Sequence, residues 1–268
     1  MHSVNYRPMS SVWGKAGSSY EEFSEHFSEA IQHCIQLIDP GPGEKVLDVA
    51  TGTGLAARLA ARQESEVTGV DFSDEMIVAA RELARGDGLS IRFDVGDAEN
   101  LPYEDSRFDV VLSTFGVMFV SRPEQAAKEL ARVCRKGGRL GLTTWPPDGT
   151  IAQLSREVTS KYRHSSNDTS HPPSPWAWGD SNRVRELLGE WFDLQFEKGC
   201  TVLREPNSER IWNLWVRSHG LMITKLEKLS TREVIAFRDE FLAFHDRFSD
   251  KFGITMPRDY LVTIGARR

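Results

Sequence analysis

The sequence predicts an α/β protein in which a mainly parallel sheet carries helices on both faces. Three observations predict this fold class. Short apolar stretches alternate with amphipathic stretches from residue 43 to residue 145. A glycine-rich turn joins the first apolar stretch to the helix after it. The stretch 108–117 is almost wholly apolar, as expected of a strand covered on both sides. Such alternation is typical of parallel strands linked by right-handed crossovers.

The first elements follow one another in a regular order. Residues 20–38 place apolar side chains at helical spacing, and the DPGPGE stretch then ends that helix. The strands expected after it are KVLDVA, EVTGVD, 89–97, 108–117 and RLGLTTW. The helices expected between them are LAARLAARQ, SDEMIVAARELARG and RPEQAAKELARVCRKGG.

The ends of two of these helices carry recognisable signals. Ser73 suits the N-cap of the second helix, and Gly86 suits its end. Pro123 suits the first position of the third helix, because its missing N–H has no partner there in any case. Gly137 and Gly138 are expected to end that helix.

The alternation breaks after residue 145. Residues 146–180 have loop composition, and the later stretches predict a helix, a strand, two amphipathic helices and a last strand, at 183–191, 192–204, 208–222, 231–252 and 258–268. We therefore divide the chain into an N-terminal helical segment, a cofactor-binding core, cap segments interleaved with late strands, and a final antiparallel strand, at 1–42, 43–145, 146–256 and 257–268. The cap helices are interpreted either as a lid over one mouth of the sheet or as the interface of a homo-oligomer.

Composition and charge exclude several classes of protein. Of the 268 residues 40% are hydrophobic and 27% are charged, which is ordinary for a globular protein. The net charge of -6 argues against a protein that binds nucleic acid through its phosphates. The first residues lack the apolar stretch of a secretory signal, and no apolar run approaches the roughly 20 residues that cross a bilayer. We expect a cytoplasmic protein with reduced cysteines that binds neither nucleic acid nor a membrane.

A cofactor site is expected where the first three strands end. After the first strand, Gly52 and Gly54 lack side chains, so that the backbone can approach a ligand closely. Asp71 ends the second strand, and its carboxylate can accept hydrogen bonds from both hydroxyls of a ribose. Asp97 and Ala98 follow the third strand, where a carboxylate can accept a hydrogen bond from the adenine amino group. These strand ends meet at one edge of a parallel sheet. The turn GTGLAA also fits a dinucleotide pattern, so these residues alone leave both NAD(P) and S-adenosylmethionine (SAM) open.

Taken in order, the motifs resemble those of the class I SAM-dependent methyltransferases, of the type that includes the ubiquinone/menaquinone methyltransferases. The stretch VLDVATGTG resembles their first motif, with Ala50 in place of the usual first glycine. The stretches GVDFSDEMIVAAR and VGDAENLPYEDSRFDVVLS resemble the next motifs, and LARVCRKGGRLGLTTW resembles the end of the core. The resemblance covers residues 43–145.

The resemblance implies a Rossmann-like, seven-stranded sheet in the order 3-2-1-4-5-7-6 with an antiparallel last strand, and SAM as the cofactor. It implies that Asp71 binds the ribose, that Met76, Asp97 and Ala98 lie at the adenine, and that Ser113 lies near the methionine portion. The full set of implied cofactor-binding residues is Asp48, Ala50, Thr51, Gly52, Gly54, Asp71, Phe72, Met76, Asp97, Ala98 and Ser113.

Missing motifs narrow the class of methyl acceptor. The fourth strand is not followed by the (N/D)PP(Y/F) loop of amino-methylating nucleic-acid enzymes, nor by the paired glutamates of protein arginine methyltransferases. The FGVMF stretch carries no acids that would bind Mg²⁺. We therefore expect a small organic acceptor, such as a hydrophobic natural-product intermediate, methylated by in-line displacement without a metal.

No residue is assigned as catalytic, because methyl transfer needs a base only if the acceptor must lose a proton. Candidates for that base are Tyr162, His164, His171, His219 and His245, each of which also suits an ordinary structural role. Several tryptophans suit either an apolar pocket or core packing, namely Trp145, Trp176, Trp178, Trp212 and Trp215. Trp13 would close over the cofactor or lie on the surface.

Two other functions stay open from the sequence. One is an NAD(P)-dependent oxidoreductase. The other is a SAM-binding member of the fold that transfers no methyl group, such as a cyclase or a binding protein.

Overall fold

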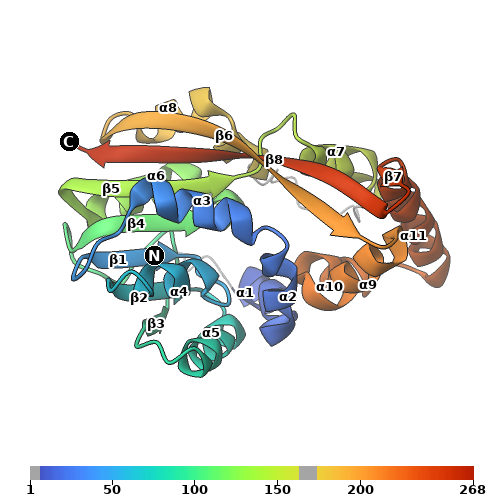
Figure 1. Ribbon diagram of the computed structural model, residues 1–268, viewed down its shortest axis with the longest axis horizontal. Coiled ribbons are helices and arrows are strands. Elements are labelled where there is room, and N and C mark those ends of the chain that lie inside the picture. Colours follow the sequence, from blue (N-terminus) through green and yellow to red (C-terminus); the bar gives the residue numbers. More distant parts are fainter. Residues whose placement is uncertain (1–6, 163–173) are drawn as a thin grey trace.

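The computed structural model describes residues 7–162 and 174–268, and it is built around one sheet (Figure 1). The strands lie in the order β3-β2-β1-β4-β5-β8-β6. The first five strands are parallel, and β8 is antiparallel to both β5 and β6. The bounds of the long strands are Lys45–Val49 (β1), Glu66–Asp71 (β2), Arg92–Val95 (β3), Phe108–Thr114 (β4), Cys134–Thr144 (β5), Phe192–Glu205 (β6) and Gly253–Arg267 (β8).

The predicted α/β fold and strand order are confirmed. The label β8 belongs to the seventh long strand along the chain, so the observed order equals the expected 3-2-1-4-5-7-6. One short strand was missed: Ser249–Asp250 (β7) pairs with the start of β8 and brings the sheet to eight strands. The last long strand also begins at Gly253, earlier than the expected 257. Within the described residues, no helix is long and apolar enough to cross a membrane.

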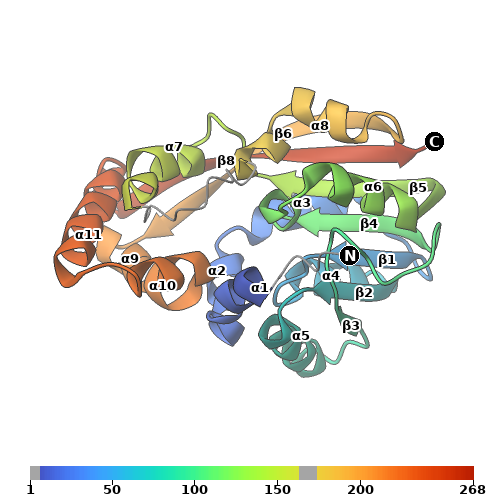
Figure 2. The ribbon, with the colours of Figure 1, turned by 180° about the vertical axis from the view of Figure 1, so that it is seen from behind.

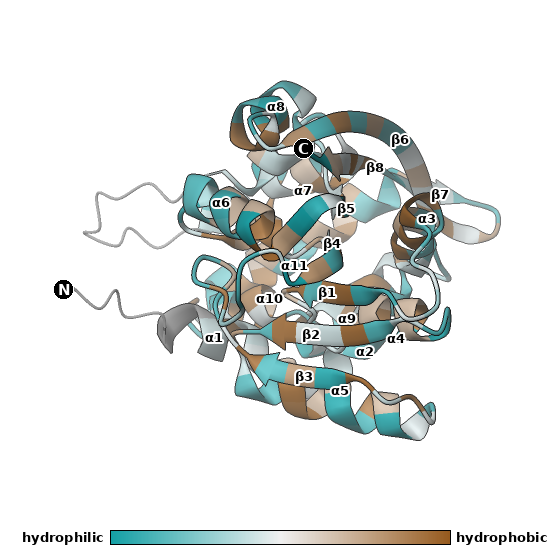
Figure 3. Cartoon of the chain, turned by 90° about the vertical axis from the view of Figure 1, so that its left-hand side faces the viewer, coloured by the Kyte–Doolittle hydropathy of each residue, from teal (hydrophilic) through white to brown (hydrophobic). Residues whose placement is uncertain are grey.

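Helices cover the two faces of the sheet (Figure 3). One face carries Ser28–Ile38 (α3) and Leu55–Ala61 (α4), and the other carries Pro123–Val133 (α6) and Ser181–Leu188 (α8). The helix Asp74–Gly86 (α5) packs along β2 and β3. Ser73 caps α5 as predicted, since its hydroxyl accepts a hydrogen bond from the Met76 N–H at 3.3 Å. Pro123 is the first residue of α6, also as predicted.

Several helix predictions were wrong in their bounds, two of them before the cap. The expected helix 20–38 is divided into Tyr20–Glu25 (α2) and α3, because Phe27 leaves the helical region with φ −126° and ψ 21°. The helix α6 ends at Val133, so Gly137 and Gly138 do not end it. Cys134 is already extended and pairs with Phe108, which places both glycines inside β5.

The cap is a second layer of helices at one end of the molecule (Figure 2). β6 and β8 pair along their whole length, whereas β8 pairs with β5 only from Leu261 to Ala266. The other halves of β6 and β8 therefore extend beyond the sheet as a two-stranded arm. The arm packs against the helices Thr150–Glu157 (α7), Ser208–Ser218 (α9), Gly220–Leu226 (α10) and Thr231–Asp246 (α11). The expected helix 208–222 is thus two helices, with His219 between them, and the expected helix 231–252 ends at Asp246.

Candidate active site

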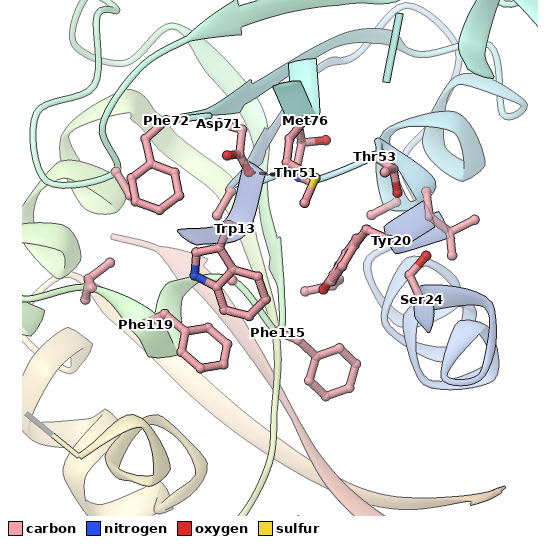
Figure 4. Close-up of a pocket in the computed structure, with 18 of the residues that line it drawn as sticks. Trp13, Tyr20, Ser24, Thr51, Thr53, Asp71, Phe72, Met76, Phe115 and Phe119 are labelled. Atoms are coloured by element: carbon pink, nitrogen blue, oxygen red, sulfur yellow. Dashed lines mark hydrogen bonds between the residues drawn. The ribbon is translucent and has the colours of Figure 1, made fainter. Parts of the chain in front are cut away.

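A pocket opens where the parallel strands end, at the carboxyl ends of β1, β2, β3 and β4 (Figure 4). Its walls come from the turns after these strands and from the N-terminal helices Arg7–Gly14 (α1), α2 and α3. The empty space, counting the part open to solvent, is ≈ 990 Å³.

The turn after β1 forms the floor of the pocket. Ala50, Thr51 and Gly52 line the pocket, and Ala50 and Gly52 have left-handed backbones with φ 54° and 55°. A left-handed backbone costs a residue with a Cβ roughly 1–2 kcal/mol, which explains why glycine is usual where this chain has Ala50. Gly54 does not line the pocket. A Cβ on Gly54 would lie 2.9 Å from the Phe93 ring, so this glycine lets α4 start against the sheet.

Asp48 lies behind the turn rather than on the pocket wall, and it is only 1% exposed. Its Oδ2 accepts hydrogen bonds from the Thr51 hydroxyl at 2.6 Å and the Ala57 N–H at 3.2 Å. Its Oδ1 has no hydrogen-bond partner among the described residues. Burial raises the pKa of Asp48 to about 7. Asp48 therefore shapes the turn, and its predicted contact with the cofactor stays a prediction.

Asp71 stands on the pocket wall at the end of β2. Its Oδ2 accepts a hydrogen bond from the Gly52 N–H at 2.9 Å, and its Oδ1 accepts one from the Ser73 N–H at 3.0 Å. Burial raises the pKa of Asp71 to about 6, although these two N–H groups favour the charged form. The following Phe72 and Met76 also line the pocket. The carboxylate is thus fixed in place before any ligand arrives.

The loop after β3 contributes the third predicted group. Asp97 and Ala98 line the pocket, and burial raises the pKa of Asp97 above its usual range. Glu99, which the sequence analysis did not single out, is 2% exposed. Its Oε1 accepts hydrogen bonds from the N–H groups of Ser121, at 2.6 Å, and Arg122, at 2.8 Å. Glu99 therefore joins this loop to the segment after β4.

Ser113 is fully buried and does not line the pocket. Its hydroxyl donates to the Val49 carbonyl at 2.8 Å and accepts from the Val117 N–H at 3.0 Å, which ties the end of β4 to the end of β1. Just beyond it, a Cβ on Gly116 would lie 2.5 Å from the Cβ of Ala50. The two strand ends are therefore held in direct contact, and the predicted role of Ser113 near the methionine portion stays a prediction.

Aromatic side chains form the wall beyond β4. Phe115 lines the pocket with a left-handed backbone, φ 59°. Its ring stacks on Trp145 with centroids 4.1 Å apart and meets Phe27 edge-on at 5.1 Å. Ile31 lines the pocket beside Phe27. Backbone strain at a pocket-lining residue indicates that the orientation of the Phe115 ring matters for function.

The N-terminal helices close another side of the pocket. Trp13 lines the pocket, is 9% exposed, and lies against Phe119 with ring centroids 4.9 Å apart. The structure thus supports the first of its two interpretations, in which Trp13 lies over the pocket. Tyr20 and Ser24 of α2 also line the pocket. The sequence analysis missed both, because nothing local marks a tyrosine that reaches a site through tertiary packing.

None of the described base candidates lies on the pocket wall. The His219 Nδ1 accepts a hydrogen bond from the Met222 N–H at 3.3 Å, and burial lowers the pKa of this histidine to about 4. His245 Nδ1 donates to the Phe241 carbonyl at 2.8 Å, and burial lowers its pKa to about 4 as well. The Tyr162 hydroxyl donates to Glu240 at 2.9 Å. His164 and His171 lie outside the described residues.

The cap tryptophans mostly pack in the core. Trp212 lies among the cap aromatics, at 5.7 Å from Phe237 and 5.4 Å from Phe241. Trp178 is 1% exposed and belongs to the hydrophobic core around the sheet, and Trp176 packs against that core. Trp215 packs against the hydrophobic core of the cap. Over the described residues, no group of three or more His, Cys, Asp or Glu side chains could hold a metal ion. The expectation of a metal-free site stays a prediction.

Comparison with known proteins agrees with this geometry. Residues 47–142 match a family model described as "Methyltransferase domain". An uncharacterized protein of Mycobacterium tuberculosis is 37% identical over 198 residues, which is 73% of this chain and 71% of that protein. A ubiquinone/menaquinone biosynthesis C-methyltransferase of Bdellovibrio bacteriovorus is 36% identical over 146 residues, 52% of this chain and 62% of that one. The crystal structure of a putative methyltransferase from Bacillus halodurans has a TM-score of 0.63 at 20% identity, covering 88% of this chain and 97% of the other.

Proposed function

Because the chain belongs to the class I SAM-dependent methyltransferases, of the type that includes the ubiquinone/menaquinone methyltransferases, we propose that it methylates a small, uncharged organic molecule. This family does not support the NAD(P) alternative. The net charge of -6 supports an acceptor other than nucleic acid.

The residues on the pocket wall fit SAM. Each oxygen of the Asp71 carboxylate accepts one backbone N–H and keeps a lone pair for a ribose hydroxyl. Asp97 and Ala98 lie on the β3 side, where we place the adenine. The turn at Ala50 and Gly52 then receives the methionine portion, which directs the methyl group toward the end of β4.

The observation that carries the proposal is the composition of the wall beyond this turn. Phe27, Ile31 and Phe115 face that part of the pocket. Among the described residues that line the pocket there is no Lys, Arg or His. Its charged residues lie at the end of β2 and in the turn after β3, namely Asp71, Asp97 and Glu99. An anionic acceptor would find no partner charge there, whereas an apolar ring would be surrounded by rings.

The chemistry asks little more of the protein than position. SAM supplies a methyl group on a positively charged sulfur, so charge is dispersed as the methyl is transferred. Phe27 and Phe115 would exclude water and hold the acceptor in line with that methyl group. With no imidazole on the described wall, the site favours an acceptor whose lone pair is free at neutral pH, such as a heteroaromatic nitrogen.

Labelled SAM tests the proposal directly. The protein is incubated with methyl-labelled SAM and a metabolite extract, and the products are separated by charge and polarity, with heat-denatured protein as the inactive control. We expect label in an uncharged, apolar fraction that the control does not produce. Label in nucleic acid, in protein or in acidic metabolites would contradict the proposed acceptor. Absence of label, with S-adenosylhomocysteine still bound, would favour the non-transferring alternative.

A further inference from the structure

The helix α2 reaches over the floor of the pocket. The ring of Tyr20 lies above Gly52, so close that a Cβ on Gly52 would be 3.4 Å from the ring carbon Cε1. Figure 4 shows the Tyr20 hydroxyl pointing into the middle of the pocket, between Trp13 and Phe115. A side chain from the N-terminal segment thus stands where the methionine portion of the cofactor is placed above.

The hydroxyl groups around the floor differ in what they already bind. The hydroxyls of Thr51 and Thr53 donate to Asp48 and Glu21, each at 2.6 Å, and the Ser24 hydroxyl donates to the Glu21 carbonyl at 2.9 Å. The Tyr20 hydroxyl makes no hydrogen bond to any other described residue. Its hydroxyl therefore remains available to a ligand over this floor.

The methionine portion of SAM brings a carboxylate into this pocket. The charged residues on the described wall are all acidic, so no side-chain cation can balance that carboxylate. The Gly52 N–H is already bonded to Asp71. Burial, with the nearby Asp71 carboxylate, raises the pKa of Tyr20 well above its usual range. The phenol therefore keeps its proton at neutral pH and remains a donor.

We propose that the Tyr20 hydroxyl donates a hydrogen bond to the methionine carboxylate of the cofactor, and that Glu21 is the positioning residue that holds Tyr20 there. The proposal rests on the cofactor orientation proposed above, in which the ribose lies at Asp71.

Glu21 fastens α2 to the turn from two sides. Its Oε2 accepts the Thr53 hydroxyl, and its Oε1 forms a close ion pair with Arg58 of α4. The side chains of Glu21 and Arg58 are only 14% and 7% exposed, so solvent screens this pair little. Arg58 also donates to Asp87 at 3.2 Å, which fixes its guanidinium independently of α2. Glu21, which follows Tyr20, is therefore anchored to Thr53, which follows Gly52.

Two ligands separate a contact with the carboxylate from a contact with the adenosine. S-adenosylhomocysteine carries the methionine-derived carboxylate, and 5′-methylthioadenosine lacks it. Calorimetric titration of Tyr20→Phe should show about tenfold weaker binding of S-adenosylhomocysteine and unchanged binding of 5′-methylthioadenosine. Because the hydroxyl has no protein partner, this variant should fold as the parent does. Equal losses for the two ligands, or no loss for either, would overturn the assignment of Tyr20.

The same pair of ligands tests the orientation on which the proposal rests. Asp71→Ala should weaken the binding of both ligands, because both carry the ribose. If Asp71→Ala leaves 5′-methylthioadenosine unaffected, the orientation is wrong. If Asp71→Ala behaves as expected and Tyr20→Phe does not, the role of Tyr20 alone is wrong.

The positioning role of Glu21 has its own test and a matched control. Glu21→Gln should show the same ligand-selective loss as Tyr20→Phe, and the double variant should lose no more than either single variant, since both act on one contact. Glu22→Gln, on the next position, removes only an exposed pair with Arg217 and should bind both ligands normally. Thr53→Val removes the hydrogen bond from Thr53 to Glu21 but keeps the ion pair between Glu21 and Arg58. It should therefore weaken S-adenosylhomocysteine binding selectively, but less than Glu21→Gln does. Additive losses, or equal losses for both ligands, would overturn the role of Glu21.

Discussion

At the scale of single residues, Asp71 shows how a predicted ligand is prepared by its surroundings. Two backbone N–H groups fix its carboxylate, while burial resists its charge. The sequence placed Asp71 at a strand end, which was enough to predict a polar group at the site. Its two N–H partners depend on the turn and on α5 together, so they could not be predicted from the residue itself.

Removal of this carboxylate should weaken cofactor binding. Asp71→Ala is expected to reduce the free energy of S-adenosylhomocysteine binding by about 2 kcal/mol or more, because it removes charge-assisted hydrogen bonds to the ribose. Isothermal titration calorimetry of the two proteins measures this difference. An unchanged dissociation constant would show that the ribose lies elsewhere.

The pKa of about 6 also predicts how binding depends on pH. The ribose hydroxyls donate to the charged form of Asp71, so protonation of the carboxylate competes with binding. Affinity for S-adenosylhomocysteine should therefore rise from about pH 5 to about pH 7 and then level, by up to tenfold per pH unit below the pKa. Asp71→Asn should lose this dependence, and a variant that keeps it would assign the titration to another group.

Gly116 is the second residue whose environment makes a strong prediction. A Cβ on Gly116 would lie 2.5 Å from the Ala50 Cβ and 2.9 Å from the Ala50 carbonyl oxygen, so the ends of β1 and β4 would have to separate. Gly116→Ala should lower the free energy of unfolding by about 1–3 kcal/mol and weaken cofactor binding. Gly86→Ala is the matched control, because a Cβ there meets nothing within 4 Å. Denaturant titration of both variants makes the comparison, and equal stabilities would contradict it.

At the scale of elements, α1 joins the cofactor loop to the cap. A Cβ on Gly14 would lie 2.9 Å from the Ser73 hydroxyl oxygen, beside the start of α5. On its other side, the backbone at Val12 and Trp13 lies directly against Gly220 of α10. Lys15, just after α1, pairs with Glu227, 212 positions later. This helix is therefore held both by the start of α5 and by the cap.

Crowding at Gly220 should move α1. Gly220→Ala places a Cβ against the Val12 carbonyl, so α1 must shift away from α10 and take Trp13 with it. We expect the free energy of unfolding to fall by about 1–3 kcal/mol and the affinity for S-adenosylhomocysteine to fall as well. Thermal denaturation and calorimetry measure the two effects. A loss of stability with normal affinity would show that α1 does not support the site.

Elements were easier to predict than their ends. The alternation up to residue 145 predicted the parallel strands, because the apolar strands and the helices between them are local features. The order of the strands was implied only by the resemblance to the methyltransferases. The break at Phe27 could not be predicted, since α2 and α3 both turn apolar side chains inward and the helical spacing runs through the break. The site shows the same limit: Gly52 and Asp97 follow from motifs, whereas Tyr20 reaches the pocket only through tertiary packing.

At the scale of the whole molecule, two cores share two strands. The main core includes Phe192 and Val262, and the cap core includes Leu203 and Ile254, all of them on β6 or β8. Continuous backbone hydrogen bonding along these strands couples the two cores.

This coupling predicts a single unfolding transition. The cap should not melt before the sheet, because its loss would strip half of β6 and β8 of their packing. Far-ultraviolet circular dichroism and tryptophan fluorescence should therefore give one midpoint in urea for both probes. Two separated midpoints would show that the cap unfolds independently.

The placement of the N-terminal wall has a consequence for how the site is made in the cell. Trp13 and Tyr20 leave the ribosome long before His219, against which the ring of Trp13 packs at 5.4 Å. A nascent chain that has already completed its first five strands still lacks the support for one side of its pocket. The enzyme therefore acquires its finished binding site only after the segment around His219 has been made and has folded against the N-terminal helices.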